Sequence, residues 1–564
     1  MADSERETAR PAGVDGTTVE VEARMDEFEE LLSTARTAYA RGDWYAAHRN
    51  FTQARTFSEL PTEDLSLLGS SAWWVGQVRE SLEISEEVYH LFNDDGDVLS
   101  AAKKALNLAL LWFIRGDLVI ASGWVNRARR ILTQLPEDVD HGYLVYLDAT
   151  VALDFGNLQP ARDAAVTLQE MGHRLRAPAL TSFGLVLAGL ADVHSGSTAT
   201  GFAQLDEAML PVLAGQVPPE WAGDIYCTVI HACHALADLS RMRAWTQATE
   251  QWCEQFHGEA IYSGICRIHR LQLQSAEGGW DAAEEAIERT GSELVGRNNW
   301  VAGEAYYQLG EIRRLRGDLS GARGAYARAQ ELGCEPQPGE SLLQQAVGKQ
   351  DAAWAGLCAA LAGRDRLACA RLLESAVEIA LALGLQEEAE RLCGQLEETA
   401  AVFATAGFRA WAGQARAAVL IAQSRHEEAL PVLQSVAREY RGLHARYETA
   451  RVYELLGRAH RGLGETGTAA AETATALAIY RELGALPDVQ RLDGRRLPGG
   501  LTERETDVLF FIAAGASNKD AADALFISQK TVGRHLANIF AKIGVSTRTA
   551  AAAWAHEHGL PLRR

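Results

Sequence analysis

Hydrophobic and small residues recur along most of the chain with the spacing of paired amphipathic helices. The clearest example covers residues 303–333. Its first apolar face consists of Tyr306, Leu309, Ile312 and Leu315. A glycine followed by an acidic residue, Gly317-Asp318, then precedes a second apolar face. This face is made of Ala322, Ala325, Tyr326 and Ala329. Intervals of three and four residues place each set on one side of a helix. The pattern therefore predicts a helical hairpin that turns at Gly317-Asp318, where glycine can adopt a positive φ.

The hairpin pattern repeats, with a glycine at the turn and a small residue five positions later. Clear copies start at Gly42, Gly116, Gly156, Gly317 and Gly464. Weaker copies start at Gly76, Gly196, Gly278 and Gly363, and degenerate ones lie near Leu239 and Ser424. The spacing is 34 to 46 residues, except for a gap of about 61 between the copies near 363 and 424. Isolated hairpins cannot bury their apolar faces, so we expect them to stack into a solenoid over residues 25–485.

This repeat region resembles tetratricopeptide-type repeats, in the longer and less regular form found in large bacterial regulators. No unit carries the full tetratricopeptide consensus, so other helical-hairpin repeats stay open. The resemblance implies an all-α solenoid that receives a peptide, protein or small-molecule effector on its concave face. Residues 1–24, which are polar and rich in turn formers, are expected to be a disordered tail.

The helical pattern breaks at "RLDGRRLPGGL", residues 491–501, which predicts a linker over 486–500 and a separate domain over 501–564. Thr502 with Glu505 and Ser517 with Asp520 have the spacing of capping boxes. Ser528 is placed to start a third helix, and Ser546 and Thr547 a fourth. Four helices in about sixty residues, with a tight turn between the second and third, indicate a helix-turn-helix domain.

The third helix of this domain has two different faces. Its expected core face carries Val532, Leu536, Ile539, Phe540 and Ile543. The opposite face carries Gln529, Lys530, Gly533, Arg534 and Ala537, which we predict to contact base edges. A small, basic face can enter the major groove, where an acidic face could not. Phosphate contacts are predicted for Ser517, Asn518, Lys519, Thr531 and His535.

The same segment closely resembles the LuxR-type, or GerE-type, helix-turn-helix of bacterial transcription factors. The matching text includes "LTERE" at 501–505, "SNKD" at 517–520, "KTV" at 530–532, "NIF" at 538–540 and "KIGV" at 542–545. The resemblance implies base reading by the third helix. It also implies a homodimer on a palindromic operator, formed through Ala551, Trp554, Ala555 and His558 of the fourth. The family often has a basic residue where this chain has Gly533 and a polar one at Ala537, so Lys530 and Arg534 carry the direct readout, supplemented by DNA shape.

Charge and composition narrow the class of protein. The chain has 564 residues and a net charge of -21, yet residues 501–564 hold eight Lys and Arg against six Asp and Glu, a net of +2. A basic domain on an acidic chain suits DNA binding by that domain alone. We expect a cytoplasmic protein, because the longest apolar run, residues 105–114, falls short of the ~20 residues of a membrane span. The eight cysteines form no CxxC pair and are expected to be buried, reduced thiols.

Signals for other chemistry are weak. In "AVGKQD" at 346–351, Gly348-Lys349 is followed by Gln350 rather than Ser or Thr, and no glycine stands five residues earlier, so no phosphate-binding loop and no ATPase is predicted. Cys227, His231 and His234 share a helix face, with Cys253, His257, Cys266 and His269 following, and could bind a metal. We favour core packing for them, and likewise for the tryptophans Trp73, Trp74, Trp112, Trp124, Trp245, Trp252 and Trp300.

The sequence therefore predicts a regulator without cofactor or catalytic site, in which the repeat region controls a domain that binds double-stranded DNA. RNA polymerase is a further candidate partner. The alternative is an interaction adaptor whose last domain no longer binds DNA specifically. The basic outer face at Lys530 and Arg534 discriminates between them, because an adaptor has no use for it.

Overall fold

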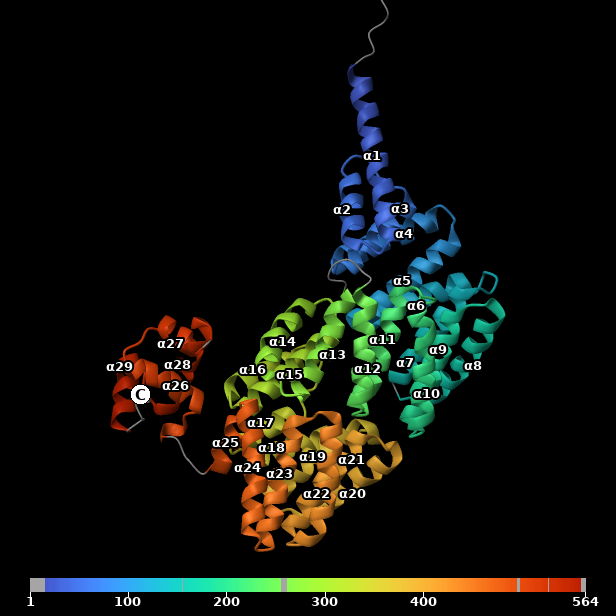
Figure 1. Cartoon of the computed structure of the whole chain (residues 1–564). Coiled ribbons are helices and arrows are strands. Elements are labelled where there is room, and N and C mark those ends of the chain that lie inside the picture. The colour runs from blue at the N-terminus through green and yellow to red at the C-terminus, as the bar shows by residue number, and fades with distance from the viewer. Residues whose placement is uncertain (1–15, 155, 255–260, 494–497, 526, 559–564) are drawn as a thin grey trace, which may run out of the picture. The chain divides into compact units, whose positions relative to one another are not determined.

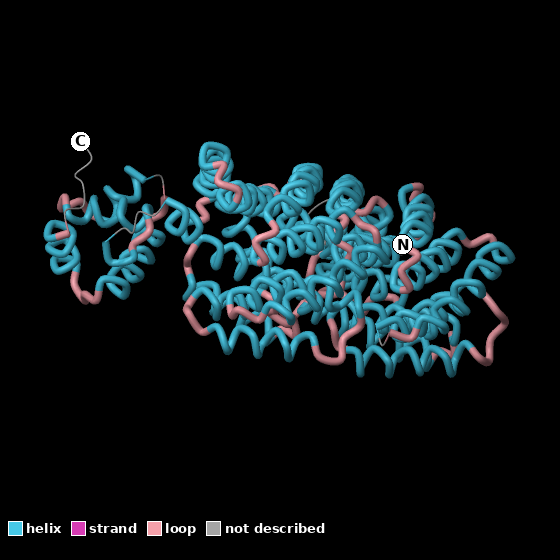
Figure 2. The backbone as a smooth tube through the Cα atoms, turned by 90° about the horizontal axis from the view of Figure 1, so that it is seen from below, coloured by secondary structure: helices cyan, strands magenta, loops and turns pink. Residues whose placement is uncertain are grey.

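The computed structural model describes residues 16–154, 156–254, 261–493, 498–525 and 527–558. Throughout these residues the regular structure is helical (Figures 1 and 2), as the sequence predicted. The chain divides into two compact units. The first consists of residues 1–235, 239–270 and 289–302, and the second of 236–238, 271–288 and 303–564. In neither unit is a described helix long and apolar enough to cross a membrane.

The first unit is built from successive antiparallel helix pairs. Its helices are α1 (Gly16–Ala40), α2 (Trp44–Ala54), α3 (Thr62–Trp74), α4 (Val78–Asp94), α5 (Val98–Arg115), α6 (Leu118–Leu132), α7 (Val139–Asp154), α8 (Leu158–Leu175), α9 (Pro178–His194), α10 (Thr198–Leu213), α11 (Pro219–Ala235) and α12 (Leu239–Glu254). Within each pair the second helix packs along the first, as α10 does along α9. Helix α1 begins at Gly16, so residues 16–24 are helical where the sequence led us to expect a disordered tail. They continue the helix-forming run that leads to the buried Phe28 and Leu32.

Three helices contribute residues to both units: α13 (Ile261–Ala276), α14 (Trp280–Leu294) and α15 (Asn299–Arg316). The second unit continues with α16 (Leu319–Glu331), α17 (Gly339–Ala346), α18 (Gln350–Leu361), α19 (Arg366–Ala382), α20 (Gln386–Phe403), α21 (Ala406–Ala422), α22 (His426–Leu443), α23 (Arg446–Gly462), α24 (Thr466–Leu483) and α25 (Leu486–Asp493). Helices α17, α19, α21 and α23 pack on one another in sequence, in addition to their hairpin partners. These odd-numbered helices therefore form one layer of a stacked array, and the even-numbered helices pack against them.

The repeated glycine-acid step has a clear physical role. All nine glycines that mark the predicted repeats have positive φ, for example 72° at Gly42 and 86° at Gly317. At two of these turns the acid that follows caps the next helix, since Asp43 accepts a hydrogen bond from the Ala46 amide and Asp318 accepts one from Gly321. The small residues five positions after the clear-copy glycines are all buried, at Ala47, Ala121, Ala161, Ala322 and Ala469. The same short sequence motif therefore specifies both the turn and the close packing of the two helices.

The structure corrects the repeat register between residues 317 and 464. Gly363 lies between two hairpins, α17–α18 and α19–α20, rather than inside one. The turns inside these hairpins are at Gly348 and Gly384, which have φ of 81° and 76°. The gap of about 61 residues therefore disappears. The degenerate turns are left-handed without glycine, because Ala237 and Ser424 have φ of 52° and 62°.

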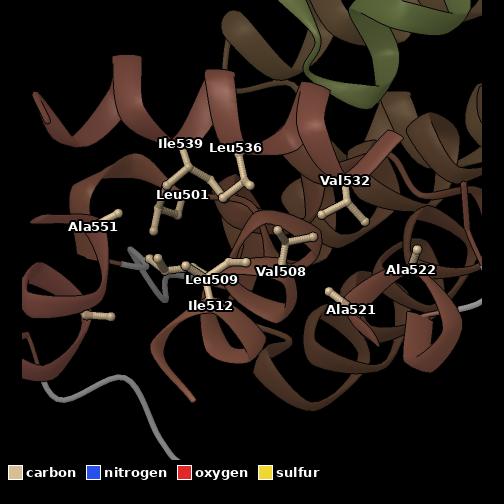
Figure 3. Packing of buried hydrophobic residues seen from close by; sticks show 11 residues of the cluster. Leu501, Val508, Leu509, Ile512, Ala521, Ala522, Val532, Leu536, Ile539 and Ala551 are labelled. Carbon is tan, nitrogen blue, oxygen red and sulfur yellow. The ribbon is translucent and has the colours of Figure 1, made fainter. Parts of the chain in front are cut away.

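The C-terminal domain consists of α26 (Glu503–Ala513), α27 (Asn518–Leu525), α28 (Gln529–Ile543) and α29 (Arg548–Glu557), preceded by the 3₁₀ turn η1 (Pro498–Gly500). Figure 3 shows side chains of α26 facing those of α28 across its core. The buried core residues are Leu501, Val508, Leu509, Ile512, Ala521, Ala522, Val532, Leu536, Ile539, Ala551 and Ala555. Both predicted capping boxes are present: Thr502 with Glu505, and Ser517 with Asp520. Each helix start is therefore fixed by the residues that the sequence indicated.

Candidate nucleic-acid interface

Helix α28 is fixed at both ends. The Ser528 hydroxyl accepts a hydrogen bond from the Thr531 amide at 3.1 Å, which caps the first turn. At the other end Gly544 adopts a left-handed conformation with φ of 71°. Val532 and Ile539 are fully buried against the rest of the domain. With the axis and the rotation of α28 set in this way, its opposite face is presented to solvent.

The exposed face of α28 has the character that the sequence predicted. Gln529, Lys530, Arg534 and Ala537 are exposed. A Cβ atom added at Gly533 would meet no atom within 4 Å, so packing does not require glycine there. The helix sequence contains no Asp or Glu. The face is consequently narrow and basic, which suits approach to the floor of a major groove.

The predicted phosphate contacts lie around the start of α27 and along α28. Lys519 is exposed, whereas the Ser517 hydroxyl already bonds the Asp520 carboxylate at 2.7 Å. Asn518 accepts a hydrogen bond from the Arg548 guanidinium at 2.7 Å, which leaves its amide NH₂ to donate elsewhere. Arg548 also donates to the Ala516 carbonyl. This anchor from α29 to the start of α27 was not foreseen from the sequence.

Thr531 and His535 are less accessible than Lys519. Both are half-buried, and the Thr531 hydroxyl shares a hydrogen bond of 2.7 Å with that of Ser528. Burial lowers the pKa of the His535 imidazole, so the ring is neutral at neutral pH. His535 can therefore offer a phosphate a hydrogen bond but no charge.

The predicted dimer residues need correction. Ala551 and Ala555 are 0% and 2% exposed and belong to the core of their own domain, because α29 packs on α26. Trp554 is half-buried, stacks on His558 with ring centroids 4.1 Å apart, and lies so close to Gly499 that a Cβ there would clash. His558 itself is exposed, and the accessible face of α29 also carries Thr549, Ala553 and His556.

Arg534 has ion-pair partners that the sequence did not predict. Its Nη2 atom lies 3.0 Å from Oδ2 of Asp318 and 3.4 Å from Oε1 of Glu284. Asp318 caps α16 through its other oxygen, and Glu284 also accepts hydrogen bonds from Arg313 and Arg316. The acids are held in place by these further bonds, while the Arg534 side chain stays 47% exposed. An arginine on the predicted reading face is therefore neutralised by acids of the repeat region.

The Cys/His cluster and the tryptophans were the other candidate sites that the sequence suggested. Among the described residues no group of three or more His, Cys, Asp and Glu side chains could hold a metal ion. Cys227 is half-buried and His231 packs edge-on against Trp300, with centroids 4.7 Å apart. His257 and the side chain of Cys266 lie outside the described residues. Cys358 is exposed, contrary to the expectation that the cysteines are buried. Trp73 and Trp74 are buried as core residues, whereas Trp300 is 41% exposed, contrary to the expectation of core packing.

Comparison with known proteins identifies the C-terminal domain. Residues 500–555 match the family of bacterial regulatory proteins described as the luxR family. A transcriptional regulatory protein of Bacillus subtilis, YhcZ, is 55% identical over 60 residues, which are 11% of this chain and 28% of that protein. The regulator LiaR of the same organism is 48% identical over 60 residues with the same coverage, and the Staphylococcus aureus response regulator VraR is 47% identical over 60, covering 29% of its length. The chain thus carries a LuxR-type helix-turn-helix domain, and it spans less than a third of these relatives, which are named as regulators rather than enzymes.

Solved structures of low sequence identity are also similar to large parts of the chain. A Rap protein complexed with the competence and sporulation factor has a TM-score of 0.38 and 11% identity, covering 69% of this chain and 99% of the Rap chain. The Cut9–Hcn1 assembly has a TM-score of 0.40 and 11% identity, covering 85% of this chain and 97% of the matched one.

Proposed function

We propose that this chain is a cytoplasmic transcriptional regulator that binds operator DNA through α28. The observation that carries the proposal is the outer face of that helix, where Lys530 and Arg534 are exposed on an element without a single acid. The fully buried Val532 and Ile539 on the other side set the direction of this face. An adaptor that had lost DNA binding would be under no constraint to keep it.

The proposed contacts divide into two kinds. Lys530 and Arg534 would bond base edges, with Gln529 beside them, and Arg534 can form the bidentate pair that guanine accepts. Lys519 and the free NH₂ of Asn518 would contact phosphates on either side and hold the domain in register. The small Gly533 and Ala537 allow the helix close approach and contribute no hydrogen bond of their own.

Dimerisation on DNA is proposed to use the exposed face of α29. Thr549, Ala553 and His556 recur at intervals of four and three residues and are exposed together. Such a face is small enough for two copies of the helix to pack closely around a two-fold axis. This surface replaces Ala551 and Ala555, which are already buried in the domain core.

Control by the repeat region is proposed to act through the acids that pair with Arg534. The arginine cannot offer its Nη2 atom to a base while Asp318 and Glu284 hold that atom. DNA binding would therefore compete with this ion pair, and an effector that separates the acids from α28 would raise the affinity for DNA. The competition is modest in energy, because exposed ion pairs contribute about 0.2–1 kcal/mol each.

Genome-wide immunoprecipitation of the intact protein tests the proposed function. Discrete peaks that share a sequence motif are expected, and they should be lost in a Lys530→Ala, Arg534→Ala double variant. Arg438→Ala, which removes an exposed arginine from α22 instead, is the matched control and should keep every peak. A wild-type protein with no peaks under several growth conditions would contradict the proposal.

A further inference from the structure

The second unit contains a cavity of about 480 Å³ that the proposed DNA contacts do not use. The repeat helices that line it are mostly odd-numbered, including α15, α17, α19, α21 and α23, joined by α25, so the cavity is formed by the inner layer of the array. Its volume lies within the range of about 300–1,000 Å³ that small-molecule sites typically have. Its lining contains both apolar and charged side chains.

The apolar part of the lining is made of small or branched side chains. It comes mainly from α19 and α21, and its residues include Val377, Leu381, Ala415, Ala418 and Ala422. Alanine at successive turns of α21 leaves room next to the helix backbone. These residues would accept a planar or aliphatic body of a ligand. Binding would be favourable because the apolar surface of that body is removed from water.

Two arginines of the lining already bond acidic residues that also line the cavity. The Arg451 guanidinium bonds the carboxylate of Glu374 at 3.1 Å and also that of Glu378. Arg491 of α25 bonds Glu454 and Asp488 in the same way. These groups satisfy one another, so a ligand need not bring a charge to match them.

Two lining groups are left without a partner. Gln414 is only 2% exposed, and while its NH₂ donates to Glu374, its Oε1 atom accepts no hydrogen bond. Arg458 lies two turns after Arg451 on α23, is exposed, and forms no ion pair with any described residue. A buried acceptor without a donor costs about 1–3 kcal/mol, which a ligand could recover.

We propose that this cavity binds a small organic anion with an apolar body and an N–H or O–H donor. The anionic group pairs with Arg458, the donor bonds Oε1 of Gln414, and the body lies against Ala415 and Ala418. The proposal does not depend on the DNA contacts of α28. It assigns to the repeat region a ligand site that the sequence alone did not locate.

The cavity has a direct route to the C-terminal domain. Helix α25 contributes Asp488 and Arg491 to the lining, and between them Gln490 donates a hydrogen bond of 3.0 Å to the carbonyl of Leu501. Leu501 is fully buried in the core of the C-terminal domain. A ligand that shifts α25 would therefore move the first core residue of that domain. This regulatory step rests on the proposed function, whereas the ligand site itself does not.

Dye binding to the full chain tests the site without DNA, so its failure is distinct from failure of the proposed function. Anilinonaphthalenesulfonate carries the three required groups: an aromatic body, an N–H and an anion. N-phenylnaphthylamine keeps the first two and lacks the anion. We expect saturable fluorescence enhancement by the sulfonate dye at one site, and weaker binding of the neutral dye. Arg458→Ala should weaken the sulfonate dye about tenfold and leave the neutral dye unchanged.

Two further variants locate the dye. Ala418→Phe fills the cavity and should abolish binding of both dyes, while Arg438→Ala on the outer helix α22 should change neither. Circular dichroism melting confirms that each variant is folded. Absence of saturable binding to the wild type would overturn the proposal. So would sulfonate-dye binding that is the same in wild type, Arg458→Ala and Ala418→Phe.

Discussion

The Arg534 guanidinium lies 3.0 Å from the Asp318 carboxylate, although the two residues belong to the helix proposed to read DNA and to the turn of a repeat hairpin. Asp318 has a second role, because its other oxygen caps α16 at the Gly321 amide. This capping bond holds the carboxylate in place independently of its ion pair with Arg534. This pair is the most direct physical link between the repeat region and the proposed DNA contacts.

Asp318→Asn is expected to raise DNA affinity about two- to fivefold. Asparagine keeps the capping oxygen but loses the charge, so Arg534 loses its nearer acidic partner and keeps the Glu284 contact at 3.4 Å, while α16 stays capped. Asp365→Asn is the matched control, because Asp365 caps α19 in the same manner, through the Ala368 amide. Fluorescence anisotropy titrations with one operator duplex at fixed salt measure both. Equal affinity of wild type and Asp318→Asn would show that the pair does not restrain Arg534.

Ala553→Arg is expected to weaken dimerisation without unfolding the domain. Ala553 is exposed on α29, so the larger side chain meets only solvent in the monomer, while two arginines would repel across a two-fold axis. Analytical ultracentrifugation on a palindromic duplex should show one protein per half-site binding independently. Cooperative, two-fold occupancy in this variant would place the dimer contact elsewhere.

Ser424→Gly is expected to stabilise the protein by up to about 1 kcal/mol, because Ser424 has a φ of 62° that glycine adopts without steric cost. Ser435→Gly, at an exposed position inside α22, should instead destabilise by about 0.5–1 kcal/mol. Thermal melting of the two variants compares them. A lower melting temperature for Ser424→Gly would mean that the serine contributes an interaction beyond the turn.

The cavity predicts a pH dependence of stability. Burial raises the pKa of Glu374 from 4.5 to about 7. Between these two pH values the folded protein keeps a proton on Glu374, whereas the unfolded chain has released it. Its contribution is fully present below pH 4.5 and is lost as the pH rises through about 7, with a magnitude on the order of 3 kcal/mol. Glu374→Gln should remove this part of the pH profile in denaturant titrations between pH 5 and 8. The same slope in wild type and variant would contradict the assignment.

The sequence was informative where structure is specified locally. A capping pair such as Thr502 with Glu505 lies within four residues and predicts the start of a helix. Gly317 likewise predicts a turn. The left-handed Ser424 was visible only as a degenerate copy, because nothing in a serine requires positive φ. Two features depend on how distant hairpins stack. They are the ion pairs of Arg534 with Glu284 and Asp318, and the cavity lined by residues from 314 to 491. No local pattern specifies those distances.

The burial of Ala551 and Ala555 shows a second limit. Small residues on a terminal helix suit a dimer contact and a close intradomain contact equally well. Only the position of α26 decides that these two methyl groups face inward. The sequence therefore identified α29 as a packing helix but not which side of it remained free.

The specificity ratio of the intact protein tests the central claim most directly. It is the affinity for a duplex carrying the immunoprecipitated motif divided by that for a scrambled duplex at the same salt concentration. Arg534→Ala should lower this ratio about tenfold or more, because base contacts contribute about 1–3 kcal/mol of discrimination. Lys519→Ala should weaken both duplexes equally and reduce the salt slope by about 1. If Arg534→Ala left the ratio unchanged, α28 would not be reading sequence and the account would be wrong.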